Sequence, residues 1–163
     1  MPASTSDDCV EAYRLVAPKW AASALNGEGA RLYGGRWNSP GRAMVYLSTS
    51  RALAALELLV HLTTPLSRRI PRTLVTVQVP RDLISGPLWK EEGWQDIPPG
   101  RASTDQGDDW LAAAPTAGVL VPSALIPEEH NLLLNPSHPD FAQVKISATS
   151  SFSFDPRLQK PTV

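Results

Sequence analysis

The amino-acid sequence predicts a single α+β domain whose core is a mainly antiparallel β-sheet accompanied by a few short helices. Short apolar segments that alternate with polar residues recur along the chain, as half-buried strands do. One segment alone combines length with strong helix propensity, and 16 scattered prolines disfavour other long helices. Because a chain of 163 residues can bury one stable hydrophobic core, we expect one domain over residues 1–163.

The N-terminal part of the chain predicts two strands separated by a glycine-rich loop. Residues 1–10 are mostly polar and are expected to form a frayed segment. Residues 12–16 alternate like a short strand, and residues 20–25 have the composition of a helical turn. Glycines at positions 27, 29, 34 and 35 then predict a loop, which leads into a second strand at residues 44–48.

The best predicted helix is the segment RALAALELLVHL, residues 51–62. Serine and threonine at 48–50 can cap its N-terminus, and it is expected to end near Thr63, before a proline. The rest of the central region predicts a strong strand at 73–80, an irregular segment at 86–100 and a short helix at 104–113.

The C-terminal part predicts further strands. Residues 118–127 and 130–141 contain apolar stretches that end in proline-marked turns, and residues 144–154 supply one or two more strands. The expected total is roughly six strands and two or three helices.

Charge, cysteine content and hydropathy exclude several classes of protein. With 15 basic and 16 acidic side chains, the chain lacks the basic excess of a general nucleic-acid or anionic-membrane binder. Cys9 is the single cysteine and cannot form an internal disulfide. We see neither a signal peptide nor an apolar run long enough to cross a bilayer, so the expected location is the cytoplasm, with no membrane contact.

Glu57 is the most unusual residue of the predicted helix. Its neighbours three and four positions away include Leu53, Ala54 and Val60, so its carboxylate lies on an apolar face. An ionised carboxylate is buried only when something offsets its desolvation. The residue pattern leaves two explanations open: an ion pair or a helix-edge glutamate that reaches water, and a carboxylate at the floor of a functional cleft.

The segment RLYGGRWN places Arg36 directly after Gly34 and Gly35. Bare backbone lets a phosphate approach closely, and a planar guanidinium suits phosphate oxygens. A plain glycine turn is the alternative, because the spacing matches neither the dinucleotide fingerprint nor the P-loop. Tyr33 and Trp37 can stack on a planar ring, although packing in the core is the more common role of such residues.

Tyr46 and Ser123 have equally modest individual signals. Tyr46 has opposite parity to Val45 and Leu47 in its strand, so it faces either a cleft or the rim of the sheet. Ser123 follows a proline, where its hydroxyl can cap a turn or bind a ligand. The three histidines and the one cysteine form no metal-binding pattern, so we expect no metal site.

Taken together, the segments GGRWNSPG, VYLSTSRALAALELLVHL and GDDWLAAAPTAGVLVPSALIPEEHNLLLNPSHPDF closely resemble the RES domain family. The resemblance covers almost the whole chain, from about Tyr13 to Phe154. The family's arginine, tyrosine, glutamate and serine fall on Arg36, Tyr46, Glu57 and Ser123.

This resemblance implies a bacterial toxin with an ADP-ribosyltransferase-like fold that acts on NAD. Some members of the family consume free NAD by hydrolysis or phosphorolysis, and others transfer ADP-ribose to a protein. The implied partner is a helix-turn-helix, Xre-like antitoxin that covers the active site and contacts DNA, so that the toxin reaches DNA only indirectly. NAD is the substrate, no further cofactor is implied, and a homodimer is possible.

The resemblance also implies roles for individual residues. Arg36 pairs with the diphosphate, which approaches Gly34 and Gly35, and Glu57 stabilises the positive charge that develops on the ribose. Tyr46 stacks on the nicotinamide, and Ser123 hydrogen-bonds the ribose or the amide. The remaining residues of the expected substrate-binding set are Arg14, Tyr33 and Asn38.

Three alternatives to an NAD-degrading toxin stay open. The first is a mono-ADP-ribosyltransferase with a protein acceptor, for which the segment 86–100, with Trp89 and Trp94, is the one candidate docking site. The second is a non-catalytic interaction domain, which the complete set of four residues disfavours. The third is an RNA-acting toxin, which the near-neutral charge disfavours.

Overall fold

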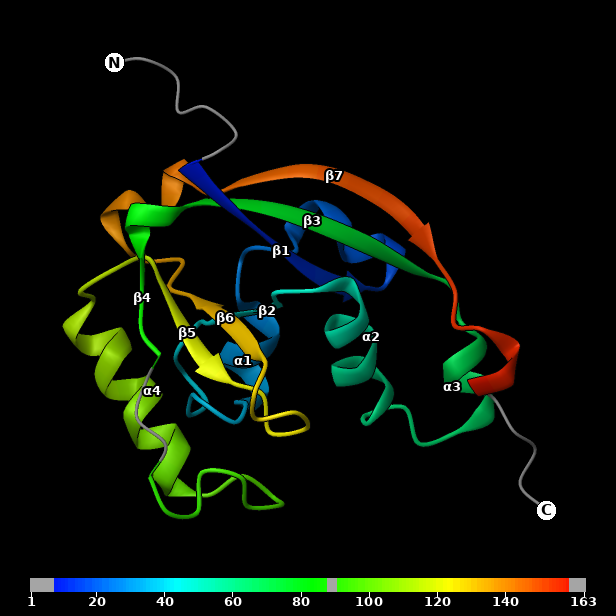
Figure 1. Ribbon diagram of the computed structural model, residues 1–163, viewed down its shortest axis with the longest axis horizontal. Coiled ribbons are helices and arrows are strands. Elements are labelled where there is room, and N and C mark those ends of the chain that lie inside the picture. Colours follow the sequence, from blue (N-terminus) through cyan, green and yellow to red (C-terminus); the bar gives the residue numbers. More distant parts are fainter. Residues whose placement is uncertain (1–7, 88–90, 159–163) are drawn as a thin grey trace.

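The computed structural model describes residues 8–87 and 91–158, and its centre is one β-sheet (Figure 1). In the described part of the chain the sheet has seven strands in the order β4-β5-β6-β2-β1-β3-β7. All neighbouring strands are antiparallel except β4 and β5, which are parallel. The strands are β1 Cys9–Val16, β2 Val45–Ser48, β3 Arg72–Pro80, β4 Ile84–Ser85, β5 Gly118–Pro122, β6 His130–Leu134 and β7 Lys145–Phe152.

The helices are short, and they flank the sheet. They are α1 Glu28–Tyr33, α2 Arg51–Leu59, α3 Pro65–Arg69 and α4 Arg101–Ala113, with 3-10 turns at Pro18–Ser23, Arg81–Leu83, Pro139–Gln143 and Pro156–Leu158. In Figure 1, α4 lies beside β4 and β5, while α2 lies below the long strands β1 and β3. The predicted α+β class with a mainly antiparallel sheet is therefore confirmed.

Several predicted boundaries were wrong near the N-terminus. Strand β1 begins at Cys9, because residues 9 and 10 pair with Pro80 and Val79 of β3, so they are not frayed. Residues 1–7 of the predicted frayed segment lie outside the described residues. The predicted helical turn at 20–25 is instead the 3-10 helix Pro18–Ser23.

Two helices were not predicted. The glycine-rich loop contains α1, which Gly27 and Gly34 delimit with φ angles of 68° and 71°, so these glycines end a helix instead of preventing one. Helix α3 begins with a reciprocal capping box between Thr64 and Ser67, a serine variant of a signal usually read from glutamate or glutamine. Helix α2 ends at Leu59, earlier than expected, and α4 starts at Arg101.

Apolar residues form separate core clusters on the two faces of the sheet. Alternation along β2 sends Val45 and Leu47 into a cluster with Val75, Val77 and Leu132. Tyr46 packs on the opposite side, against the cluster of Trp37, Met44, Trp94, Trp110, Val119, Val121 and Leu133. The second cluster joins α4 to the loop that carries Arg36, so it fixes one wall of the site described below.

Replacing Gly107 by alanine is expected to destabilise the fold. A Cβ atom at this position of α4 would lie 1.6 Å from the Trp37 carbonyl oxygen, so the helix would have to move away from the loop. Overpacking of this kind typically costs about 1–3 kcal/mol, and the contact with rigid backbone places Gly107→Ala at the upper end. Urea unfolding measures the effect. Gly100→Ala, in the cap of the same helix with nothing within 4 Å of its Cβ, is the control expected to stay near wild type.

Candidate active site

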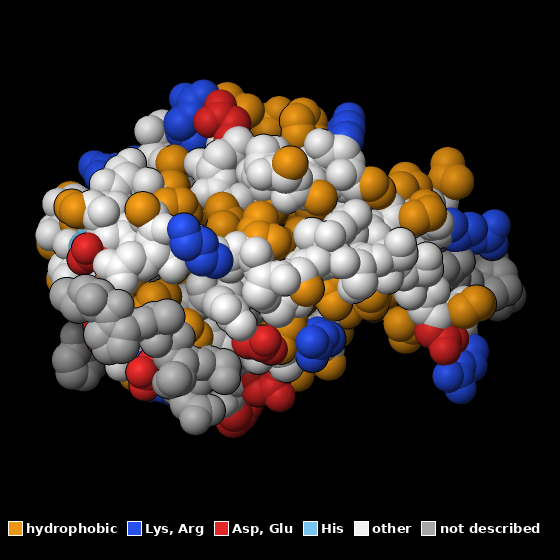
Figure 2. All heavy atoms as spheres, turned by 90° about the horizontal axis from the view of Figure 1, so that it is seen from above, with side chains coloured by type: hydrophobic (Ala, Val, Ile, Leu, Met, Phe, Trp, Pro, Cys, Tyr) orange, Lys and Arg blue, Asp and Glu red, His pale blue; other side chains and the backbone are white. Residues whose placement is uncertain are grey.

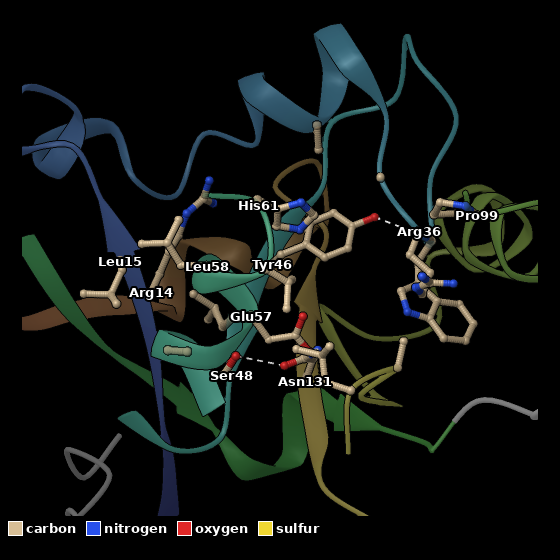
Figure 3. A pocket seen from close by; sticks show the side chains of 18 of the residues that line it. Arg14, Leu15, Arg36, Tyr46, Ser48, Glu57, Leu58, His61, Pro99 and Asn131 are labelled. Atoms are coloured by element: carbon tan, nitrogen blue, oxygen red, sulfur yellow. Dashed lines mark hydrogen bonds between the residues drawn. The ribbon is translucent and has the colours of Figure 1, made fainter. Parts of the chain in front are cut away.

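A cleft of about 720 Å³ opens where β1 and β2 separate. These strands share one residue pair, Tyr13 with Ser48, and residues of both strands beyond this pair line the cleft. Figure 3 shows side chains from both strands, from α2 and from β6 converging on this space. The polar residues that line it include Arg14, Arg36, Tyr46, Ser48, Glu57, His61 and Asn131.

The carboxylate of Glu57 is held at one of its two oxygens. Ser50 caps the N-terminus of helix α2, where its hydroxyl accepts a hydrogen bond from the Leu53 amide at 3.0 Å. The helix places Glu57 in the cleft. The Oε1 atom accepts hydrogen bonds from Ser123 Oγ at 2.8 Å and from Asn131 Nδ2 at 2.6 Å. Among the described residues, no donor contacts Oε2, which leaves this oxygen available to a ligand.

These contacts bear on the two explanations for Glu57, whose side chain is half-buried. No salt bridge to Glu57 exists among the described residues, so an ion pair does not offset its burial. Two neutral donors, Ser123 and Asn131, bind the carboxylate in place of a cation, and the carboxylate faces a cleft. The functional explanation is the one that this geometry favours.

Ser123 lies behind Glu57 and is fully buried. Its hydroxyl donates to Glu57 and accepts from the amides of Leu125 and Ile126 at 3.1 and 3.2 Å. Ser123 does not line the cleft, whereas its neighbours Pro122 and Ala124 do. The expected hydrogen bond from Ser123 to ribose or amide is therefore replaced by a contact that orients Glu57.

A second hydrogen-bond network holds the loop that carries Arg36. The Tyr46 hydroxyl donates to Asn38 Oδ1 at 2.6 Å and accepts from the Trp37 amide at 3.0 Å. Asn38 Nδ2 donates to the carbonyl oxygens of Ala30, Ser39 and Arg42 at 2.9, 3.1 and 3.0 Å. Burial raises the pKa of Tyr46, so its hydroxyl stays protonated and remains a donor at neutral pH.

The structure places Asn38, Tyr33 and Trp37 differently from a set of residues that all contact a ligand in the main cleft. Asn38 is 1% exposed and its polar atoms bind the protein, so it supports the loop instead of lining the main cleft. Tyr33 is 83% exposed and borders a smaller neighbouring hollow with Pro40 and Thr104. Trp37 is in the core, as the common role of such residues suggested.

Gly35 leaves the space that the Tyr46 hydroxyl occupies. A Cβ at Gly35 would lie 2.6 Å from the Tyr46 hydroxyl oxygen, which two hydrogen bonds hold in place. Gly34 adopts a φ angle of 71°, where other residues are strained. Both glycines also border the cleft.

Gly35→Ala is therefore expected to displace the Tyr46 phenol, loosen the Arg36 loop and destabilise the protein. The steric cost is about 1–3 kcal/mol, which thermal unfolding measures. Gly29→Ala is the matched control for stability, because Gly29 lies in the same segment and also borders the cleft, but its Cβ would meet nothing within 4 Å. Equal losses of stability in the two variants would contradict a specific role for Gly35.

Two arginines give the cleft positive charge. Arg36 Nη1 donates to the carbonyl oxygens of Trp94 and Asp96 at 2.8 and 3.0 Å, and Arg14 Nη1 donates to that of Ala24 at 3.1 Å. In the described part of the chain, neither guanidinium forms a salt bridge with a carboxylate. Burial lowers the pKa of Arg14, but a guanidinium stays charged, so both arginines can attract an anionic ligand.

The segment 86–100 is built differently from the expected docking loop. Trp94 is 7% exposed and stacks on Trp37 with ring centroids 6.1 Å apart, so its ring packs inside the protein. Trp89 lies outside the described residues. Ile97, which is 92% exposed, and Pro99 are apolar side chains that this segment presents at the cleft.

Sequence reasoning missed Ser48, His61 and Asn131 as residues of the site. Ser48 appeared as a possible helix cap, but Ser50 holds that position. His61 was considered only as a metal ligand, a role that its sequence context did not support, and it lines the cleft. A polar residue at the end of each of two neighbouring strands, Ser48 and Asn131, was the available signal, and the two are paired in register.

Three further observations concern metal binding, membrane-spanning helices and the distribution of basic side chains. The described residues contain no group of three or more His, Cys, Asp or Glu side chains placed to hold a metal ion. They also contain no helix with the length and apolar character needed to cross a membrane. On the face seen in Figure 2, Lys and Arg side chains are dispersed instead of forming one stripe.

Comparisons with known proteins agree on one family. The family model described as RES domain matches residues 11–155. A protein of Sphingobium sp. (strain YBL2) named "Prs ADP-ribosylating toxin" is 41% identical over 150 residues, covering 87% of this chain and 91% of that protein. A "Toxin Res" of Yersinia enterocolitica is 40% identical over 151 residues, covering 90% and 98%.

A solved structure supports the fold. It is the crystal structure of the Mycobacterium tuberculosis MbcT–MbcA toxin–antitoxin complex, which superposes with a TM-score of 0.68 over 93% of this chain and 87% of the other. At 22% sequence identity, this similarity concerns the fold alone.

Proposed function

The chain belongs to the RES domain family, and from this premise we propose that it is a toxin that cleaves the nicotinamide–ribose bond of NAD. The observation that carries the proposal is the arrangement around Glu57. One carboxylate oxygen is held by Ser123 and Asn131, the other is available, and Arg14 and Arg36 line the same cleft.

This arrangement suits the chemistry of the reaction. Breaking the bond releases neutral nicotinamide and leaves positive charge on the ribose, which a fixed carboxylate stabilises most strongly in the transition state. The two guanidinium groups would bind the diphosphate, for which their planar donors are well suited. Tyr46, whose ring is fixed by its hydroxyl, would border the nicotinamide.

Water or inorganic phosphate is the proposed acceptor of the ADP-ribosyl group. A ribosyl cation held above Glu57 reacts with a nucleophile that reaches the face of the ribose opposite the carboxylate. Water and phosphate are both small enough to enter the cleft. The second candidate function is ADP-ribosylation of a protein, which the name of the Sphingobium relative favours.

The proposed partner is a helix-turn-helix antitoxin that covers the cleft and inhibits the toxin. The similar M. tuberculosis structure is a complex of a toxin with an antitoxin, which supports the existence of such a partner. Through the antitoxin, the toxin would contact DNA indirectly. A non-catalytic interaction domain is disfavoured, because the polar contacts around Glu57 have no evident use in a surface that only binds a partner.

The test uses protein made by cell-free synthesis, which avoids toxicity to a producing cell. The protein is incubated with NAD labelled in the adenylate part, with and without phosphate, and in parallel with a cell extract. Release of nicotinamide together with free ADP-ribose or its phosphorylated form supports the proposal. Label on one protein band, with little free product, would support the second candidate, and no nicotinamide release in any arm would contradict both.

A further inference from the structure

Glu57 accepts hydrogen bonds from Ser123 and from a relay of two neutral side chains, Ser48 and Asn131, that come from different strands. Ser48 Oγ, at the end of β2, donates to Asn131 Oδ1 at 2.8 Å. Asn131 Nδ2, in β6, donates to Glu57 Oε1 at 2.6 Å, and Ser123 approaches the same oxygen from the other end of the network. Figure 3 shows Ser48, Asn131 and Glu57 close together beneath Tyr46.

The Glu57 carboxylate determines which way the Asn131 amide faces, and Ser48 anchors the amide in that orientation. An amide has an acceptor oxygen and a donor nitrogen, and a carboxylate can bind only the nitrogen. The nitrogen is therefore directed at Glu57, and the Ser48 hydroxyl, which can donate or accept, donates to the amide oxygen on the other side. The register of the sheet supports this arrangement, because Ser48 and Asn131 lie opposite each other on β2 and β6.

We propose that Asn131 and Ser48 are positioning residues that fix the Glu57 carboxylate so that Oε1 is occupied and Oε2 faces the reacting ribose. This inference rests on the proposed NAD cleavage. Two donors on one oxygen restrict the carboxylate to one orientation, whereas an unrestrained glutamate samples several rotamers. The relay acts through Glu57, so it contributes to the transition state more than to the binding of NAD.

Alanine variants test the relay by separating kcat from KM. Asn131→Ala is expected to lower kcat for nicotinamide release by about tenfold to a hundredfold, the usual effect of misplacing a reacting group, with KM for NAD nearly unchanged. Ser48→Ala is expected to lower kcat less, because Asn131 still donates to Glu57 but loses the hydrogen bond that anchors its amide oxygen. Wild-type kcat in both variants would overturn the proposal, as would a loss confined to KM, which would assign Asn131 to substrate binding.

The controls remove similar groups at nearby positions. Thr49→Val removes a hydroxyl that also bonds β6, at the His130 carbonyl oxygen at 2.9 Å, next to Ser48 in sequence. Asn135→Ala removes a buried asparagine that follows β6 and accepts from the Ser137 amide at 3.0 Å. Neither residue lines the cleft, so both controls are expected to keep wild-type kcat even where their unfolding temperature falls.

Asn131→Asp keeps the shape of the side chain, so it gives an answer even if the alanine variant fails to fold. When the new carboxyl group is protonated, it donates to Glu57 as the amide does. When pH rises and the proton is lost, two carboxylates meet at hydrogen-bond distance and repel. The variant should therefore lose kcat as pH rises, over a range in which Asn131→Ala keeps the pH profile of the wild type.

Other titratable or charged groups in the cleft do not mimic this result. They are Tyr13, Arg14, Arg36, Tyr46 and His61, and all of them remain in every variant. Identical pH profiles for Asn131→Asp and Asn131→Ala would overturn the relay. Wild-type protein that releases no nicotinamide would instead contradict the proposed function itself.

Discussion

Glu57→Gln is expected to lower the rate of nicotinamide release by about a hundredfold to a thousandfold, the usual effect of removing a main electrostatic contact to a transition state. Glutamine keeps the length of the side chain and an oxygen that can accept from Ser123 and Asn131. The position of Oε2, however, becomes an amide nitrogen, which carries no negative charge and presents a donor to the cationic ribose. The loss should appear in kcat, measured with saturating NAD.

The control for this variant is Glu129→Gln. Glu129 is an exposed glutamate in the turn between β5 and β6, next to the site in sequence but not part of the cleft. Its replacement removes the same charge from the protein and is expected to leave kcat within about twofold of wild type, since exposed surface changes are usually small. If Glu57→Gln cleaves NAD like the wild type and unfolds at the same denaturant concentration, Glu57 has a purely structural role.

The fold class and the strong strands could be predicted from the sequence because their signals are local. Alternation identified β2 and β3 to within one residue, and helix propensity with serine capping identified the start of α2. Helix α1 was missed because it lies between two glycines, and glycines that are close together in a sequence usually indicate a loop. Their positive φ angles, which let the chain turn into and out of the helix, are a property of the folded chain.

The candidate site was predictable only in part, since its residues are distant in sequence. The apolar neighbours of Glu57 in the sequence singled out its carboxylate, which lines the cleft in the structure. Its partners Ser123 and Asn131, however, are 66 and 74 residues away, so no local pattern links them to it. Asn38 shows the opposite error: it is close to Arg36 in the sequence, but its hydrogen bonds stabilise the loop.

Arg36→Lys is expected to lower kcat/KM for NAD by about tenfold to a hundredfold, although it keeps the positive charge. In the structure, Nη1 alone supports the loop by donating to the carbonyl oxygens of Trp94 and Asp96. Nε and Nη2 remain for the diphosphate, since no contact within the described residues engages them. A lysine ammonium has to serve both partners from one nitrogen, so it loses either the loop contact or the phosphate contact.

The magnitude follows from the hydrogen bonds that lysine cannot make. A hydrogen bond to a charged group contributes about 1.5–3 kcal/mol, and about 1.4 kcal/mol corresponds to a factor of ten. The effect should appear mainly in KM, because a diphosphate contact is made in both the ground state and the transition state. Glu57→Gln should instead act on kcat, so the two variants are expected to differ in kind as well as in size.

Arg42→Lys is the matched control for this change. Arg42 lies in the same loop region, is exposed, approaches Asp108 at 3.8 Å and does not line the cleft. If both lysine variants bind and cleave NAD as well as the wild type at NAD concentrations below KM, Arg36 does not bind the diphosphate. Its guanidinium would then serve the loop alone, and Arg14 would be the remaining arginine in the cleft available for the anionic part of the substrate.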